Sequence, residues 1–309
     1  MRPPVSVPAW MEIRGPVREA LAAGSPVVAL ESTVIAHGLP HPYNIELALD
    51  MERILTSYGV TPATIGVLGG RACIGLTPAE IEHLATASGI RKLSRRDMAI
   101  AIAQGLDGAT TVAGTLLLAH LAGMRVFCTG GIGGVHRSHA FDVSGDLPAL
   151  AETPMIVVCA GAKAILDLPA TREWLETHAV PVLGYNTDEF PAFFTPRSGL
   201  TVDAVVRSPA EVARIALRHW ETGMRSAVLV AVPPPAEEML APEAAEAAIS
   251  QALAEAEERG VRGWELTPFV LDRLVEITAG ASLRANLALL RNNAHVAAQI
   301  AKQISRGGI

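Results

Sequence analysis

The sequence predicts an α/β protein with three layers, α/β/α, built on a largely parallel central sheet and completed by a helical C-terminal segment. Short apolar runs of strand length alternate with helix-length periodic segments through most of the 309 residues. This alternation is typical of parallel strands joined by helices that cover both faces of the sheet. Half of the residues are hydrophobic and 18% are charged, as expected for a chain with a large buried core. We expect residues 1–309 to form a single domain.

The first half of the chain supplies alternating elements. Apolar runs predict strands at 26–33, 63–70 and 125–131. Periodic segments predict helices at 44–59, 77–89 and 108–123. Thr77 and Glu80 have the spacing of a capping box at the start of one of these helices. Ser94 and Asp97 repeat that spacing, so a further helix is expected to begin at Ser94.

The second half continues the alternation and then becomes helical. Strands are predicted at 155–160, 180–187 and 226–235, and helices at 171–178 and 208–223. From residue 242 to residue 304 the pattern is helical throughout, and it includes the string "SLRANLALLRNNAHVAAQIAKQI". These helices are expected to form an additional layer on the sheet.

Composition excludes several classes of protein. The net charge of −6 argues against an electrostatic nucleic-acid surface. No apolar run reaches the roughly 18 residues that span a bilayer, and the N-terminus lacks the apolar stretch of a signal peptide. Cys73, Cys128 and Cys159 lie far apart without metal-ligand spacing, so we expect buried free thiols in a reducing compartment. The sequence predicts a cytoplasmic protein with no nucleic-acid or membrane partner.

Polar residues follow two of the predicted strands, where ligands bind in parallel α/β sheets. Glu31 comes directly after the first strand, although a carboxylate there also suits a simple cap of the next turn. The loop "CTGGIGGVHRSHAFDVSGD" contains glycines that allow close backbone approach to a ligand. His136, Asp142, Ser144 and Asp146 follow within the same loop. Its glycines do not have the G-x-G-x-x-G spacing of a dinucleotide site.

Two of the three lysines lie where the sequence predicts a binding or catalytic site. Of the 25 cationic residues only Lys92, Lys163 and Lys302 are lysines. Lys92 belongs to "RKLSRRD" at a predicted helix start, which suits an anion, although such a cluster is also common on solvated surfaces.

Lys163 follows an apolar strand and Gly161. It could be an exposed lysine in the first turn of a helix starting near Ala162. However, the helix dipole and the apolar flanks both favour a neutral, nucleophilic amine.

The motifs together resemble those of a known family. "ESTVIAHGLPHPYN", "KLSRRD", "GATTVAGT", "TGGIGGVHR", "FDVSGDL", "VVCAGAKAILDL", "TPFVLDRL" and "SLRANLALLRNNA" resemble the pseudouridine-5'-phosphate glycosidases, which are related to indigoidine synthase A-like proteins. The resemblance extends from about residue 26 to residue 302. It implies a lyase that cleaves the C–C glycosidic bond of pseudouridine 5'-phosphate reversibly to uracil and ribose 5-phosphate. It also implies a divalent metal, usually Mn²⁺, and a homotrimer.

The resemblance also implies a role for individual residues. Glu31 matches the proton donor, Lys163 the lysine that bonds covalently to the sugar, and Asp142 the metal-linked aspartate. The remaining matches are to substrate-binding positions: Lys92, Val112, Ser144, Gly145 and Asp146, with Thr129, His136 and Asn286 holding the base. Asn292 and Asn293 lie near Asn286 and are alternatives to it. The spacer "RSHAF" is short for the family, so His139 is given no role.

The implied chemistry explains why the site needs a lysine. A C–C glycosidic bond has no leaving heteroatom to protonate, so a pair of carboxylates is insufficient. A lysine–sugar imine supplies the electron sink, and arginine cannot form one because it does not lose its proton in proteins. Three alternatives remain at this stage. They are a Schiff-base aldolase-like lyase on a phosphorylated sugar, a nucleotide-binding oxidoreductase, and a non-catalytic binding protein.

Overall fold

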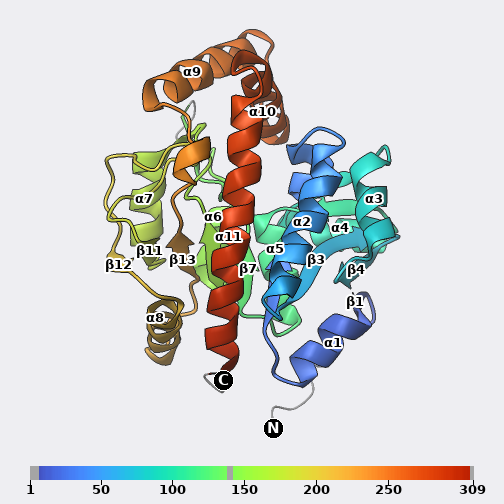
Figure 1. Cartoon of the computed structure of the whole chain (residues 1–309). Helices are drawn as coiled ribbons and strands as arrows, with labels where there is room; N and C mark the ends of the chain where they lie inside the picture. Colours follow the sequence, from blue (N-terminus) through green and yellow to red (C-terminus); the bar gives the residue numbers. More distant parts are fainter. Residues whose placement is uncertain (1–6, 138–141, 307–309) are drawn as a thin grey trace.

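The computed structural model describes residues 7–137 and 142–306, without the side chain of Trp264. In this part of the chain an eleven-stranded sheet forms the centre (Figure 1). Its main path has the order β1 (Met11–Ile13), β4 (Arg71–Ile74), β3 (Thr61–Leu68), β2 (Val27–Leu30), β7 (Val126–Cys128), β9 (Ile156–Cys159), β13 (Val228–Ala231), β11 (Val182–Tyr185) and β12 (Ala204–Val206). β6 (Gly108–Thr110) pairs with β3, and β5 (Arg91–Leu93) with β6.

The predicted fold class is confirmed, with one antiparallel region. Every pairing from β2 through β12 is parallel, whereas β3 pairs antiparallel with both β4 and β6. β3 and β4 are joined directly through Gly69 and Gly70, which both have positive φ values, of 54° and 76°. A two-residue turn with two positive φ angles makes a hairpin and therefore an antiparallel pair.

Helices cover both faces of the sheet (Figure 1). The helices of the first half are α1 (Gly15–Ala22), α2 (Tyr43–Ser57), α3 (Pro78–Thr86), α4 (Met98–Ala103), α5 (Val112–Leu121) and α6 (Asp146–Glu152). Those of the second half are α7 (Leu168–Thr177), α8 (Pro209–Glu221), α9 (Pro242–Glu258), α10 (Leu266–Ile277) and α11 (Ala281–Arg306). α11 lies across one face in contact with α2 and α8, and α9 and α10 lie beyond its N-terminal end.

The predicted helix 108–123 is instead a strand followed by a helix. Residues 108–110 form β6, and α5 begins after Thr111, whose side chain accepts a hydrogen bond from the Gly114 N–H. The apolar pattern continues without interruption because both elements are buried, so hydrophobicity alone could not locate this boundary. The N-cap threonine is the local reason that the helix starts where it does.

A single large cluster of apolar side chains joins the sheet to the helices on both faces. The capping box at Thr77 and Glu80 is present as predicted. All three cysteines are buried free thiols, also as predicted, and burial raises the pKa of Cys159 to about 12. Among the described residues, no helix has both the length and the apolar character needed to cross a membrane.

Candidate active site

Most of the predicted site residues meet in one cavity, although they come from distant motifs. This cavity has a volume of about 430 Å³. Those of the predicted residues that line it are Glu31, Lys92, Val112, His136, Asp142, Ser144, Gly145, Asp146 and Lys163. It is rich in hydroxyl and charged groups, including Ser94, Arg96 and Thr111, and we call it the polar lobe.

A smaller apolar space of about 50 Å³ adjoins the polar lobe. The two share five residues, Glu31, Thr33, Lys92, Lys163 and Thr267, so these side chains stand between them. The other residues of this space are largely apolar, and we call it the apolar lobe. They are Val34, His37, Phe193, Pro268, Leu271, Asn286 and Leu290, with three glycines.

Glu31 is a buried carboxyl group at the end of β2. The Thr129 hydroxyl donates a hydrogen bond to its Oε1 atom. Burial raises the pKa of Glu31, because a charged carboxylate is costly away from water, while Lys163 and Thr129 act in the opposite direction. A carboxyl group whose pKa is raised in this way is suited to donate a proton.

Thr129 reaches the site through Glu31, since it does not line either lobe. Its position at the end of β7 is fixed by Asn293, whose Nδ2 donates to the Thr129 carbonyl over 2.9 Å. The structure thus gives the three asparagines of α11 different positions. Asn286 lines the apolar lobe, Asn293 holds the backbone beneath it, and Asn292 donates to the Pro233 carbonyl.

Lys163 lies in a turn and not in a helix, so the expectation of a helix starting near Ala162 is wrong. Its backbone N–H donates to the Ile132 carbonyl over 3.0 Å, and its carbonyl accepts from the Leu166 N–H over 3.1 Å. The helix, α7, begins five residues later, because the Asp167 side chain caps it by accepting from the Ala170 N–H. The argument from the helix dipole therefore does not apply to Lys163, although the lysine does face the cavity as expected.

Lys92 is partly buried on β5 between the two lobes. Burial lowers the pKa of its ammonium group, and the nearby Lys163 lowers it further. The capping box predicted for this segment is present between Ser94 and Asp97, and the Ser94 backbone N–H donates to Asp97 Oδ2 over 3.0 Å. It starts a short 3₁₀ turn at Arg95–Asp97 that leads into α4.

The loop after β7 is held in shape by Asp146. Its two oxygens accept from the Ala113 N–H over 3.0 Å and from the Gly133 N–H over 2.8 Å. Asp146 thus joins the glycine-rich loop to the start of α5, where Val112 lies. Gly133 must be glycine here, because a Cβ atom at this position would lie 2.2 Å from the Ser144 hydroxyl.

His136 and Asp142 lie side by side in the polar lobe. The His136 backbone N–H donates to the Asp142 backbone carbonyl over 2.9 Å. Burial lowers the pKa of His136, and Asp142 opposes that shift. Within residues 7–137 and 142–306, no group of three or more His, Cys, Asp or Glu side chains is arranged to hold a metal. His139 lies outside the described residues.

Sequence reasoning missed two residues of the apolar lobe, His37 and Phe193. His37 sits on a single π-helical turn, Val34–Gly38, a type of structure that is frequent at functional sites. Its buried Nε2 atom has no hydrogen-bond partner among the residues that the structure describes. The same string "ESTVIAHG" that contains Glu31 also contains His37, and a polar side chain so close to a strand end was a usable signal.

Comparison with known proteins places the chain in a family. Residues 16–303 match the family model described as indigoidine synthase A like protein. The chain belongs to this family. Members that resemble it are named pseudouridine-5'-phosphate glycosidase. The Chloroflexus aurantiacus member is 53% identical over 96% of this chain and 100% of its own. The Caldanaerobacter subterraneus subsp. tengcongensis member is 49% identical over 96% and 97%.

Solved structures of the family share the fold closely. An indigoidine synthase A-like protein from Thermotoga maritima is 37% identical, with a TM-score of 0.89 over 96% of this chain and 97% of its own. A prealnumycin C-glycosynthase, solved in complex with ribulose 5-phosphate, is 38% identical, with a TM-score of 0.89 over 97% and 99%. The family predicted from the sequence motifs is confirmed.

Proposed function

We propose that the protein is a pseudouridine-5'-phosphate glycosidase that cleaves its substrate to uracil and ribose 5-phosphate. The observation that carries the proposal is the meeting of Lys163 with the buried carboxyl group of Glu31 in one cavity. Lys163 supplies an amine that can form a covalent bond to the sugar, and Glu31 supplies a proton. The names of relatives that share about half of their residues with this chain support the same reaction.

The chemistry uses both groups in turn. The ribose ring opens as the C1'–O4' bond breaks and O4' takes a proton from Glu31, which makes C1' electrophilic. The amine of Lys163 adds to C1' and releases a proton that returns to Glu31. The nitrogen lone pair then forms the C1'=N bond while the C1'–C5 bond breaks. The electron pair of that bond goes to C5 of uracil, which takes up a proton for which Glu31 is the donor. Water hydrolyses the imine and returns the lysine and ribose 5-phosphate.

The two lobes suit the two ends of the substrate. The apolar lobe, with Phe193 and Asn286, fits a flat base that needs a few hydrogen bonds. The polar lobe, with Ser94 and Arg96, fits the phosphate, and Lys92 lies within reach of both lobes. We assign the base to the apolar lobe, with Asn286, and the sugar phosphate to the polar lobe.

The resemblance implies Mn²⁺, and the donor set near Asp142 sets a limit on how it is held. Asp142 provides a carboxylate in the polar lobe, with His136 beside it. Hard divalent cations accept one carboxylate together with several waters and substrate phosphate oxygens, so these residues fit a loosely held ion. Bound there, the ion would neutralise negative charge on the substrate. Chelation should remove activity, Mn²⁺ should restore it, and Asp142→Asn should abolish Mn²⁺ binding in calorimetry. Full activity after exhaustive chelation would exclude an essential metal.

The decisive experiment follows release of free uracil from pseudouridine 5'-phosphate by the purified protein. Borohydride added during turnover should trap a pentose phosphate on Lys163, identified by peptide mass spectrometry. Absence of uracil release, or an adduct on a different residue, would refute the proposal. The homotrimer that the resemblance implies is part of the same proposal. Light scattering tests it, since the assembly should have three times the mass of the 32.4 kDa chain.

A further inference from the structure

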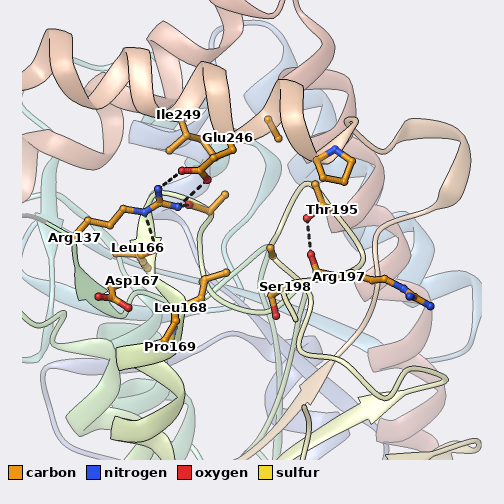
Figure 2. Close-up of a pocket in the computed structure, with 14 residues that line it drawn as sticks. Arg137, Leu166, Asp167, Leu168, Pro169, Thr195, Arg197, Ser198, Glu246 and Ile249 are labelled. Atoms are coloured by element: carbon orange, nitrogen blue, oxygen red, sulfur yellow. Dashed lines mark hydrogen bonds and ion pairs between the residues drawn. The ribbon is translucent and has the colours of Figure 1, made fainter. Parts of the chain in front are cut away.

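Arg137 links the turn that carries Lys163 to helix α9. Its Nη2 atom donates to the Ala164 carbonyl over 3.0 Å, and its Nε atom donates to the Leu166 carbonyl over 3.1 Å. The same guanidinium reaches both carboxylate oxygens of Glu246, at 2.6 Å and 3.2 Å. Figure 2 shows Arg137 between Glu246 on α9 and the backbone near Leu166. One side chain therefore holds three separate acceptors.

The turn at Lys163 depends on contacts from outside itself. On its N-terminal side the backbone is tied to the glycine-rich loop through Ile132. On its C-terminal side the short pair of β8 (Val135–His136) and β10 (Leu166–Asp167) brings Arg137 next to it. The two carbonyls that Arg137 holds lie one and three residues after Lys163. The backbone of the lysine is thus fixed from both directions.

Arg137 acts from outside the reaction space. Leu166 lines the polar lobe and also a second, open cleft of about 540 Å³. Arg137 lines this second cleft, together with Ala164 and Glu246, and does not line the polar lobe. Figure 2 shows Arg137 and Glu246 there. The turn that follows Lys163 therefore forms part of the wall between the two spaces, and the guanidinium holds that wall from the side away from the polar lobe.

The geometry explains why an arginine is needed. A guanidinium presents five donors in a rigid plane, whereas a lysine ammonium is a single point on a flexible stem. The ion pair with Glu246 contributes little by itself, since the Glu246 side chain is 57% exposed and that of Arg137 is 32% exposed. Its function is to orient the guanidinium, and the two carbonyl contacts then orient the turn.

We propose that Arg137 is a positioning residue for Lys163, which sets where the amine stands relative to C1' of the sugar without touching the substrate. This inference rests on the proposed function, in which Lys163 is the nucleophile. A misplacement of about 1 Å costs a reaction on the order of 100-fold in rate. The loss of Arg137 should therefore appear in the covalent step and leave substrate binding intact.

The test compares Arg137 with a matched arginine elsewhere in the same protein. Arg172 also bridges a carbonyl and a carboxylate, donating to Thr201 over 3.3 Å and to Asp203 over 2.9 Å. Arg137→Met should lower kcat about 10- to 100-fold with KM unchanged. Trapping of pentose phosphate on Lys163 by borohydride in a single turnover should slow by the same factor. Arg172→Met should leave both rates unchanged, whatever it does to the melting temperature.

Two further measurements separate positioning from general stability. Arg137→Lys should be only slightly faster than Arg137→Met, since lysine keeps the positive charge but not the planar set of donors that contacts both carbonyls. In Arg137→Ala, added methylguanidinium can enter through the open cleft and should raise the trapping rate, and it should have no effect on Arg172→Ala.

Three results would overturn the inference. They are an unchanged trapping rate in Arg137→Met, a rise in KM alone, or an equal loss of rate in Arg172→Met. If the parent protein forms no adduct on Lys163, the proposed function itself fails and this inference fails with it.

Discussion

Replacing Thr129 with valine should keep Glu31 protonated to higher pH. The Thr129 side chain is fully buried, and its hydroxyl donates to Glu31 Oε1. Valine has nearly the same shape but no hydroxyl, so the carboxylate loses a partner that it cannot replace from solvent. A hydrogen bond to a charged group contributes about 1.5–3 kcal/mol. Losing that contact destabilises the ionised form of Glu31 relative to the protonated form, so the pKa of Glu31 should rise further.

The direction of the effect on rate follows from the proposed role of Glu31 as an acid. Burial already raises its pKa, and the contact with Thr129 partly opposes that rise by stabilising the ionised form. The variant loses the opposing contact. The alkaline limb of the kcat profile, where Glu31 gives up its proton, should therefore move to higher pH.

The assay is uracil release measured across a range of pH for the parent and Thr129→Val. Thr64→Val is a matched control, because the buried Thr64 hydroxyl donates to Glu52 over 2.6 Å, a second threonine–glutamate pair that lies outside both lobes. The control should leave the profile where it is. A limb that moves to lower pH or stays in place in folded Thr129→Val protein would refute the reasoning, as would an equal shift in the control.

Four other variants, at three residues, test the remaining parts of the site. Lys163→Ala and Lys163→Arg should both lose turnover while retaining the parent melting temperature, and near-normal activity in the arginine variant would exclude an imine at this position. Lys92→Ala should lower kcat/KM for pseudouridine 5'-phosphate roughly ten- to a few hundred-fold and hardly change the slow turnover of pseudouridine. Equal losses for the two substrates would place the phosphate elsewhere. Glu31→Gln should be inactive yet more stable than the parent at alkaline pH, with the difference vanishing at acidic pH. The reason is that a carboxyl group with a raised pKa contributes stability below its unfolded pKa and loses it as pH rises through the folded pKa. Melting temperatures across the pH range measure this, and a constant difference would contradict it.

The sequence predicted the layers of this fold better than its boundaries. Alternating apolar and periodic segments were sufficient to predict the parallel strands, because each strand is buried on both faces. The helix that follows Lys163 was placed too early because its start is set by the Asp167 side chain, which caps a turn that hydrophobicity does not reveal. The antiparallel β3–β4 pair was missed for a similar reason. The turn that joins the two strands depends on only two residues, Gly69 and Gly70, and hydrophobicity does not reveal it.

Residues that line the two lobes could be predicted where a motif contains them. They could not be predicted where their position depends on how deeply the folded chain buries them. Asn286 and Asn293 are seven residues apart, which places them on the same face of α11, so periodicity could not separate them. The structure does so by depth, since one lines the apolar lobe and the other is bonded to the Thr129 carbonyl. Arg137 ends the motif "TGGIGGVHR", but its contacts could not be predicted from the sequence, because two of its three acceptor groups are backbone carbonyls.

Helix α11 is the last element to be synthesised, and it completes the wall of the apolar lobe. Glu31, Lys92 and Lys163 all precede it, yet Asn286 and Leu290 complete the wall of the apolar lobe, and Asn293 holds the end of β7 beneath Glu31. A nascent chain that has passed residue 163 thus carries Lys163 and Glu31 without the walls that α11 adds to the apolar lobe. The apolar lobe is complete when the last helix packs across the sheet, so an unfinished chain has the residues proposed for the chemistry but no enclosed place for a substrate.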